Sequence, residues 1–154
     1  MNQGTGDMPE FSFYDPGYPG LLIENFNNQK TMQWIGAQLT DVRPGYAEVS
    51  MQWREEFTQQ SNTVHGGILT TIGDNAGGYA AWTLEPNDAN MLAVEFKINL
   101  LGEAKGDPII ARGSVVKQGR TLTITRVDIY SVENGIEKLC AIMQQTLMCI
   151  RPMQ

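Results

Sequence analysis

The sequence has few histidines and cysteines, and fewer basic than acidic residues. It contains one histidine, two cysteines, and 11 Lys and Arg against 17 Asp and Glu, giving a formal net charge of −6. This acidic balance disfavours a nucleic-acid surface. No zinc-type Cys/His spacing, Walker loop, Rossmann fingerprint or Gly-x-Ser-x-Gly pattern occurs. Metal hydrolases, nucleotide-binding folds of these types and Ser-His-Asp enzymes are therefore not favoured.

Long hydrophobic runs and secretory features are missing as well. No apolar run approaches the ~18–20 residues that a membrane-spanning helix needs. The first seven residues include neither a positive nor an apolar segment, so we expect no secretory signal. Cys140 and Cys149 fall in one expected strand, where nine positions separate them by roughly 30 Å, too far for a disulfide. Reduced thiols favour a cytoplasmic location.

The pattern along the chain predicts one domain after a short arm. Residues 1–20 combine Gly, Pro and aromatic residues without a period, which predicts an irregular arm before a domain at 21–154. The domain should hold an amphipathic helix at 21–35 and a long helix from Gly66 or Gly67 to about 84. Strands are expected at 37–42, 46–53, 92–101, 108–117, 121–132 and 137–150. One long helix among five or six antiparallel strands predicts an α+β fold, with a curved sheet around the helix.

Two of these elements have informative patterns. Gly73, Gly77 and Gly78 each cost about 1 kcal/mol relative to Ala inside a helix, so close approach by the surrounding sheet should offset the loss. In the strand at 92–101, apolar residues alternate with Ala, Glu, Lys and Asn, which predicts a half-buried strand. The strand lacks Pro and Gly, so we expect its edge to be paired.

The start of the long helix carries the sequence's strongest chemical signal. His65, Gly66 and Gly67 stand at the expected helix start, and Asp74 follows two turns later. A backbone amide at a helix N-terminus can hold a developing oxyanion, and glycine lets a carbonyl come close to bare backbone. A lone helical Asp is usually a surface or capping residue. Helical spacing, however, places Asp74 beside Gly77 and Gly78, where a substrate has room, and this favours acyl-group chemistry.

The run from Asn62 to Trp82 resembles the signature of the hotdog-fold acyl-CoA thioesterases, in particular the PaaI-like, phenylacetate-pathway branch. That signature is His-Gly-Gly with an acid nine residues after the His, followed by small residues on a long helix. The likeness continues through residues 92–101, 104–106 and 116–122, and it covers about 38–150. It implies a hotdog fold, and hydrolysis of a CoA thioester with an aromatic or a short- to medium-chain acyl group. No metal or organic cofactor is implied.

The resemblance also assigns roles to residues. Asp74 would act as the general base on water or as the nucleophile, and the Gly66 amide would hold the oxyanion. His65 would support the loop, and Gly67 would lie against the substrate. Relatives have an Asn six residues before the His, where this chain has Gln59; Gln60 or Asn62 could substitute, or all three could be polar loop residues. A Ser or Thr that assists the water in some relatives is replaced by Ala93, so that assistance is absent.

The segment of Lys117, Gly119, Arg120 and Thr121 resembles the family region near the nucleotide end of CoA, although an ordinary hairpin with solvated charges fits equally. The resemblance further implies a homodimer or a dimer of dimers, such as a homotetramer, whose sites combine Gly66 and Asp74 from different protomers. Two other functions stay open. One is a non-catalytic acyl- or aryl-CoA-binding protein. The other is an enoyl-thioester hydratase, although hydratases place the Asp before the His, the reverse of the order here.

Overall fold

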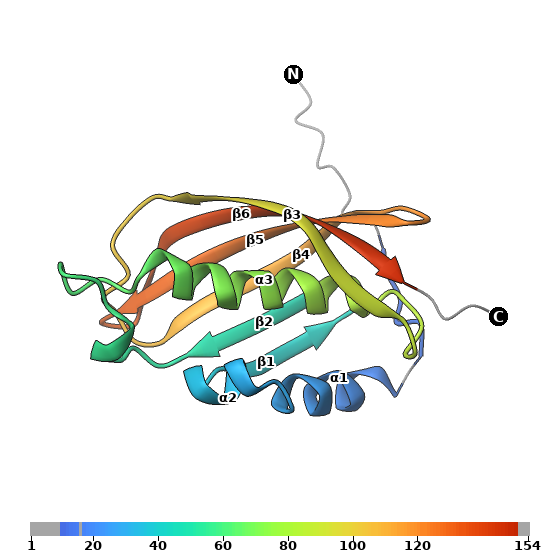
Figure 1. Cartoon of the computed structure of the whole chain (residues 1–154), viewed down its shortest axis with the longest axis horizontal. Coiled ribbons are helices and arrows are strands. Elements are labelled where there is room, and N and C mark those ends of the chain that lie inside the picture. Colours follow the sequence, from blue (N-terminus) through green and yellow to red (C-terminus); the bar gives the residue numbers. More distant parts are fainter. Residues whose placement is uncertain (1–9, 16, 151–154) are drawn as a thin grey trace, which may run out of the picture.

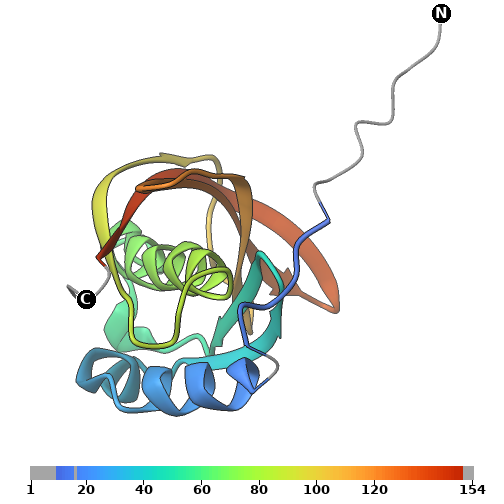
Figure 2. The same ribbon diagram turned by 90° about the vertical axis from the view of Figure 1, so that its right-hand side faces the viewer.

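The computed structural model describes residues 10–15 and 17–150 of the chain. In the described part, six antiparallel strands form one sheet in the order β1-β2-β4-β5-β6-β3. Figure 1 labels the elements, and Figure 2 shows the sheet curving around helix α3. The helices are α1 (Tyr18–Asn27), α2 (Lys30–Ile35), the short 3-10 helix η1 (Glu55–Phe57) and α3 (Gly66–Trp82). The strands are β1 (Gln38–Arg43), β2 (Tyr46–Met51), β3 (Asn90–Leu100), β4 (Ile109–Gln118), β5 (Leu122–Glu133) and β6 (Ile136–Ile150). The long helix within a curved antiparallel sheet confirms the predicted architecture.

Helix α3 packs closely against the sheet because small residues meet at the contact. A Cβ on Gly113 of β4 would lie only 2.3 Å from the carbonyl oxygen of Ala76 on α3. A Cβ on Gly73 would lie 3.1 Å from Ile129 and 3.2 Å from the sulfur of Met143. Of the three glycines that weaken α3 as an isolated helix, Gly73 and Gly77 allow the close approach expected from the sequence. The expectation is wrong for Gly78, because a Cβ there would meet no atom within 4 Å.

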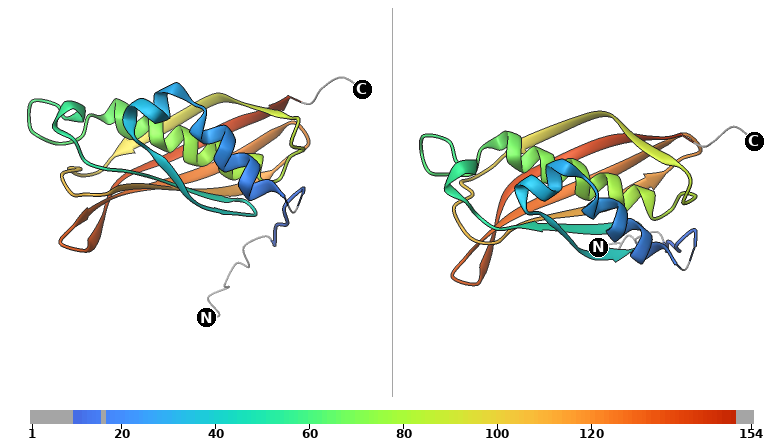
Figure 3. Two further views of the ribbon diagram at one scale, coloured as in Figure 1. Left: turned by 90° about the horizontal axis from the view of Figure 1, so that it is seen from below. Right: turned by 60° about the horizontal axis from the view of Figure 1, so that its bottom comes forward.

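The first helical segment differs from the prediction of one helix at 21–35. Helix α1 already begins at Tyr18, three residues early, and Gln29 adopts an extended conformation (φ −72°, ψ 117°) that separates α1 from α2. At this break the Gln29 side chain reaches α3, where it donates to Asn75 and to Tyr79, both at 2.9 Å. Figure 3 shows α1 and α2 running along α3. Of the predicted arm, residues 1–9 and 16 lie outside the described residues.

Strand β3 is more exposed than its alternating sequence predicted. It lies at the end of the sheet, and Leu92, Val94, Phe96 and Leu100 are 43%, 56%, 47% and 58% exposed. A bulge between Ala93 and Glu95 shifts the alternation, so that Ala93 and Phe96 pair with the inward residues Leu147 and Gln145 of β6. The prediction of a half-buried strand is therefore wrong for a single chain, because no element among the described residues pairs with the outer edge of β3.

Two remaining expectations concern the cysteines and membranes. No disulfide joins Cys140 to Cys149, as predicted from their spacing. Between residues 10 and 150, apart from residue 16, no helix is long and apolar enough to cross a membrane.

Candidate active site

The N-terminus of α3 presents a backbone amide with no acceptor. His65 is the N-cap residue, and its Nδ1 accepts a hydrogen bond from the Gly67 amide at 2.9 Å. Its own amide donates to the carbonyl of Phe57 at 2.8 Å, which fixes the loop before the helix. Among the described residues, nothing accepts a hydrogen bond from the Gly66 N–H. That N–H therefore remains available to a ligand at the positive end of the helix dipole.

The second group is the carboxylate of Asp74, in the middle of α3. Eight residues separate it from Gly66, which corresponds to about 12 Å along the helix axis. Burial raises the pKa of Asp74 above its ordinary value, and a hydrogen bond from Gln145 Nε2 to Oδ1 opposes that shift. No other described group donates to this carboxylate. A half-buried carboxylate with one oxygen that no described group contacts has the character of a general base or a nucleophile.

Asp74 lies in the wall of a cavity of about 310 Å³ between α3, β3, β6 and the α1–α2 segment. It is the sole carboxylate among the described lining residues, and Ala93 of β3 lines the same space. The Ser/Thr slot of the resemblance thus lies beside Asp74, occupied here by a methyl group. The full lining is Asn25, Gln29, Asp74, Asn75, Gly78, Tyr79, Trp82, Asn90, Met91, Ala93 and Leu147.

The predicted loop residues lie with His65 and not with Asp74. Gln59, Gln60 and Asn62 precede α3 in a loop that is closed by hydrogen bonds of 2.9 Å from Gln59 N to Thr63 O and from Asn62 N to Gln59 O. Asn62 has a positive φ of 58°, as the tight turn requires. None of the three lines the Asp74 cavity. Within one chain they belong to the Gly66 end of the helix.

The candidate CoA-binding residues lie at the other end of α3. Lys117, Gly119, Arg120 and Thr121 form or flank the β4–β5 turn, and Lys117 and Arg120 are exposed. The neighbouring Gln118 donates to the carbonyl of Leu84 at 3.0 Å, just past the C-terminus of α3. In a single chain the turn is therefore remote from Gly66.

Comparison with known proteins decides the family. Residues 61–138, about half of the chain, match the sequence profile described as "Thioesterase superfamily". The chain belongs to this superfamily. A thioesterase family protein from Silicibacter pomeroyi has a crystal structure that matches with a TM-score of 0.84 and 39% identity, over 87% of this chain and 98% of that one.

Two further relatives agree. Human acyl-coenzyme A thioesterase 13 is 34% identical over 98 residues, which is 63% of this chain and 69% of the relative. The PaaI protein of the E. coli phenylacetic acid degradation operon shares the fold, with a TM-score of 0.74 and 22% identity over 83% and 89% of the two chains. The predicted hotdog fold and the membership of the thioesterase superfamily are thus confirmed, the fold is shared with PaaI, and the protein is a thioester hydrolase.

The cavity of this thioesterase includes residues that the sequence analysis did not select. Tyr79 donates from its hydroxyl to Asn25 Oδ1 at 2.6 Å and accepts from Gln29 Nε2, which also donates to Asn75. These contacts join α1 and the residue before α2 to the wall beside Asp74. Asn25 and Gln29 are four residues apart, a helical spacing that would have placed them on one face. No pattern indicated that this face meets α3.

Gln145 is the other residue that the sequence analysis missed. It contacts Asp74 from β6, and it occupies an inward position in the series Ala141, Met143, Gln145 and Leu147. A polar residue within an apolar inward series was a signal visible in the sequence. Nothing in the sequence indicated that its partner would be Asp74 on α3.

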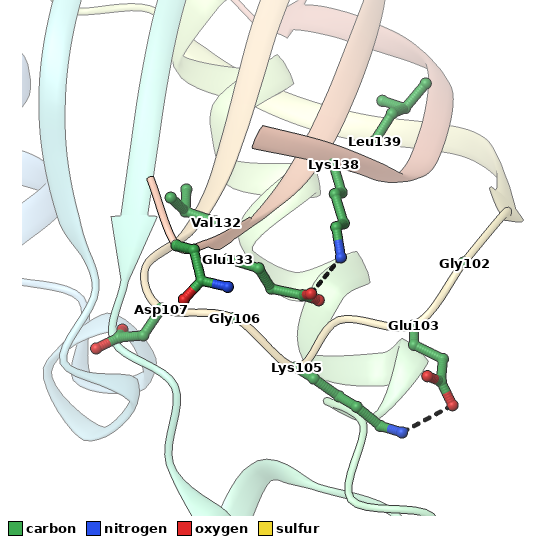
Figure 4. A pocket seen from close by; sticks show the side chains of 10 residues that line it. Gly102, Glu103, Lys105, Gly106, Asp107, Val132, Glu133, Lys138 and Leu139 are labelled. Carbon is green, nitrogen blue, oxygen red and sulfur yellow. Dashed lines mark hydrogen bonds and ion pairs between the residues drawn. The ribbon is translucent and has the colours of Figure 1, made fainter. Parts of the chain in front are cut away.

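A larger hollow of the thioesterase lies apart from these groups. It has a volume of about 780 Å³ and lies between the β3–β4 loop and the β5–β6 turn (Figure 4). Its cations are matched by acids, since Lys105 pairs with Glu103 at 2.9 Å and Lys138 pairs with Glu133. It has no excess positive charge for an anionic ligand. Within the described residues, no group of three or more His, Cys, Asp or Glu side chains is placed to hold a metal ion.

Proposed function

We propose that this thioesterase hydrolyses an acyl-CoA thioester, with an aromatic or a short- to medium-chain acyl group, to the carboxylic acid and free CoA. The observation that carries the proposal is the pair of incomplete groups on α3. The Gly66 N–H has no acceptor among the described residues, and the Asp74 carboxylate has one unoccupied oxygen in a cavity wall. The Gly66 N–H can donate a hydrogen bond to a developing oxyanion. The Asp74 carboxylate can take a proton from water or attack an acyl carbon.

The reaction uses both groups at the thioester carbonyl. As a general base, Asp74 takes a proton from water while the water oxygen bonds to the carbonyl carbon and the carbonyl oxygen becomes an oxyanion at the Gly66 N–H. The intermediate then expels the CoA sulfur, which takes up the proton from Asp74. As a nucleophile, Asp74 instead displaces the CoA thiolate and forms an anhydride, which water hydrolyses. Both routes require an ionised Asp74.

The separation of the two groups supports a site shared between protomers. Both must act within about 3 Å of one carbonyl, whereas about 12 Å separates their positions along the helix axis. Pairing with a second copy brings Gly66 of one chain to Asp74 of the other and covers the apolar edge of β3, where Phe96 and Leu100 are half exposed. We therefore propose a homodimer or a dimer of dimers as the active unit.

The remaining candidate residues divide between the two protomers of such a site. His65, Gly67, Gln59, Gln60 and Asn62 accompany the Gly66 amide. The turn of Lys117, Gly119, Arg120 and Thr121 lies beyond the C-terminus of α3, at the end of the helix opposite Gly66. Its two exposed cations would approach the phosphates of CoA from the protomer that supplies Asp74. Neither organic cofactor nor metal has a step in this mechanism.

A spectrophotometric free-thiol assay over a panel of aryl-, short- and medium-chain acyl-CoA esters tests the function. Saturable thiol release with at least one ester is expected. Saturable binding without thiol release would instead establish a CoA-binding protein, and loss of enoyl absorbance with an unsaturated ester would establish a hydratase. Either of these results would refute the proposal.

Subunit mixing tests the shared site. Asp74→Asn and Gly66→Pro homo-oligomers should each be inactive, because each lacks one of the two groups. Pro is well tolerated at the first helical position but has no N–H, so Gly66→Pro keeps the helix and removes the oxyanion donor. Hybrids should regain activity, since one of their two sites holds both intact groups. Gly66→Ala is the matched control: it keeps the N–H, and its Cβ meets only the flexible side chain of Leu100 at 2.8 Å. Verified hybrids without activity, or a fully active monomer by light scattering, would refute the shared site.

A further inference from the structure

Gln145 is a fully buried amide in a position where the sheet otherwise presents apolar side chains. It is 1% exposed, between Met143 and Leu147 on the face of β6 that covers α3. Burying a primary amide without hydrogen bonds is costly, so a glutamine here needs partners that a leucine or a methionine would not. Its contacts show which partners these are.

The two ends of the amide meet different elements. Nε2 donates to Oδ1 of Asp74 on α3, and Oε1 lies 3.4 Å from the hydroxyl of Thr125 on β5. Thr125 is fully buried as well. Because the Thr125 hydroxyl can donate to the carbonyl end of the amide, it orients the NH₂ end toward Asp74.

Gly77 makes room for this arrangement. A Cβ at Gly77 would lie 2.3 Å from Oε1 of Gln145 and 2.8 Å from Oγ1 of Thr125. The amide therefore occupies the space that any other residue at position 77 would fill. Residues from three elements, α3, β5 and β6, thus surround the contact of Gln145 with Asp74, in which Nε2 also donates to the main-chain carbonyl oxygen of Asp74 at 3.5 Å.

We propose that Gln145 is a positioning residue for Asp74: its amide holds Oδ1 and leaves the second carboxylate oxygen for the water or the thioester. This inference rests on the proposed role of Asp74 and extends it to a residue that touches neither reactant. Burial alone raises the pKa of Asp74, and the Gln145 N–H opposes that shift by stabilising the anion. Gln145 thereby also widens the pH range in which the carboxylate is ionised.

The test is Gln145→Met, which preserves approximate volume and removes the N–H. The matched control is Gln144→Met, because Gln144 is exposed on the opposite face of β6. The first readout does not depend on activity: the pKa of Asp74, followed by carboxyl ¹³C NMR of Asp-labelled protein and assigned with Asp74→Asn. We expect the pKa to rise in Gln145→Met, because the N–H that stabilises the anion is lost, and to stay unchanged in Gln144→Met.

The second readout is the pH profile of kcat in the thiol-release assay. In Gln145→Met the acid limb should move up by the same amount as the NMR pKa, and kcat on the high-pH plateau should fall several-fold because the carboxylate is less well oriented. Gly77→Ala should move the acid limb in the same direction while Gln145 itself is intact. Thr125→Val should do so to a smaller extent, because the amide loses the group that orients it.

The possible outcomes are distinct. An unchanged Asp74 pKa together with an unchanged pH profile in folded Gln145→Met would overturn the positioning role. So would a loss of activity that is equal at every pH and accompanied by a lower melting temperature, since that pattern marks a purely structural residue. If wild-type protein releases no thiol from any ester, the proposed function fails, and the NMR shift still decides whether Gln145 controls Asp74.

Discussion

Replacing Asp74 by Asn should abolish turnover while the fold stays intact. The two side chains have the same shape, and the Oδ1 atom of an Asn side chain can accept the hydrogen bond that Gln145 Nε2 donates to the carboxylate. The variant therefore keeps the local packing and loses the group that removes a proton from water or attacks the thioester. Loss of a general base costs about 10²- to 10⁴-fold in rate, so kcat should fall by at least ~10²-fold.

The same substitution should not lower stability at neutral pH. Because burial raises the pKa of Asp74 above its ordinary value of 3.8, the folded protein binds this proton more tightly than the unfolded chain does. The free energy of unfolding therefore falls as pH rises through the folded-state pKa. The uncharged amide of the Asp74→Asn variant would carry no such penalty. The melting temperature of the variant relative to wild type should thus increase as the pH rises from the ordinary pKa of 3.8 through the raised folded-state pKa of Asp74, and then level off.

The assay combines kcat from thiol release with calorimetric melting at several pH values in that range. Asp88→Asn is the matched control, because it makes the same chemical change at an exposed position and should alter neither quantity. An Asp74→Asn protein that keeps more than about a tenth of wild-type kcat would refute the catalytic role. A variant melting temperature that drops most at neutral pH would refute the view that the half-buried carboxylate destabilises the fold.

Three further predictions concern packing, capping and assembly. Gly113→Ala should destabilise the fold by about 1–3 kcal/mol, because its Cβ would lie 2.3 Å from a carbonyl oxygen of α3. The control Gly20→Ala, which has open space around its Cβ, should leave the melting temperature equal or higher. Equal melting temperatures of the two variants would contradict the close contact. His65→Ala should lose the N-cap and about 1 kcal/mol, with a several-fold lower kcat, whereas His65→Asn should restore the cap; an unchanged melting temperature in the Ala variant would count against capping. Phe96→Lys should shift the oligomer toward monomer by light scattering and lower activity with it, and a fully active oligomer would show that this edge is not the interface.

The sequence alone determined the features that depend on local pattern. Periodicity located the six strands of the described residues and the long helix α3, because alternation and helical spacing are properties of neighbouring residues. The motif from His65 to Asp74 placed a helix start and a carboxylate two turns apart, since both positions lie on one regular element, whereas the cap formed by His65 was seen only in the structure. The thioesterase assignment followed from this local order.

What depends on contacts between distant segments was decided by the tertiary structure. The exposure of β3 follows from its place at the end of the sheet and from a bulge at Val94, neither of which the alternation of its residues records. The break at Gln29 coincides with hydrogen bonds to α3, more than forty residues away. The contact between Gln145 and Asp74 spans 71 residues and exists because Gly77 leaves space for an amide. Sequence pattern reports which face a residue occupies, and only packing between elements determines what that face meets.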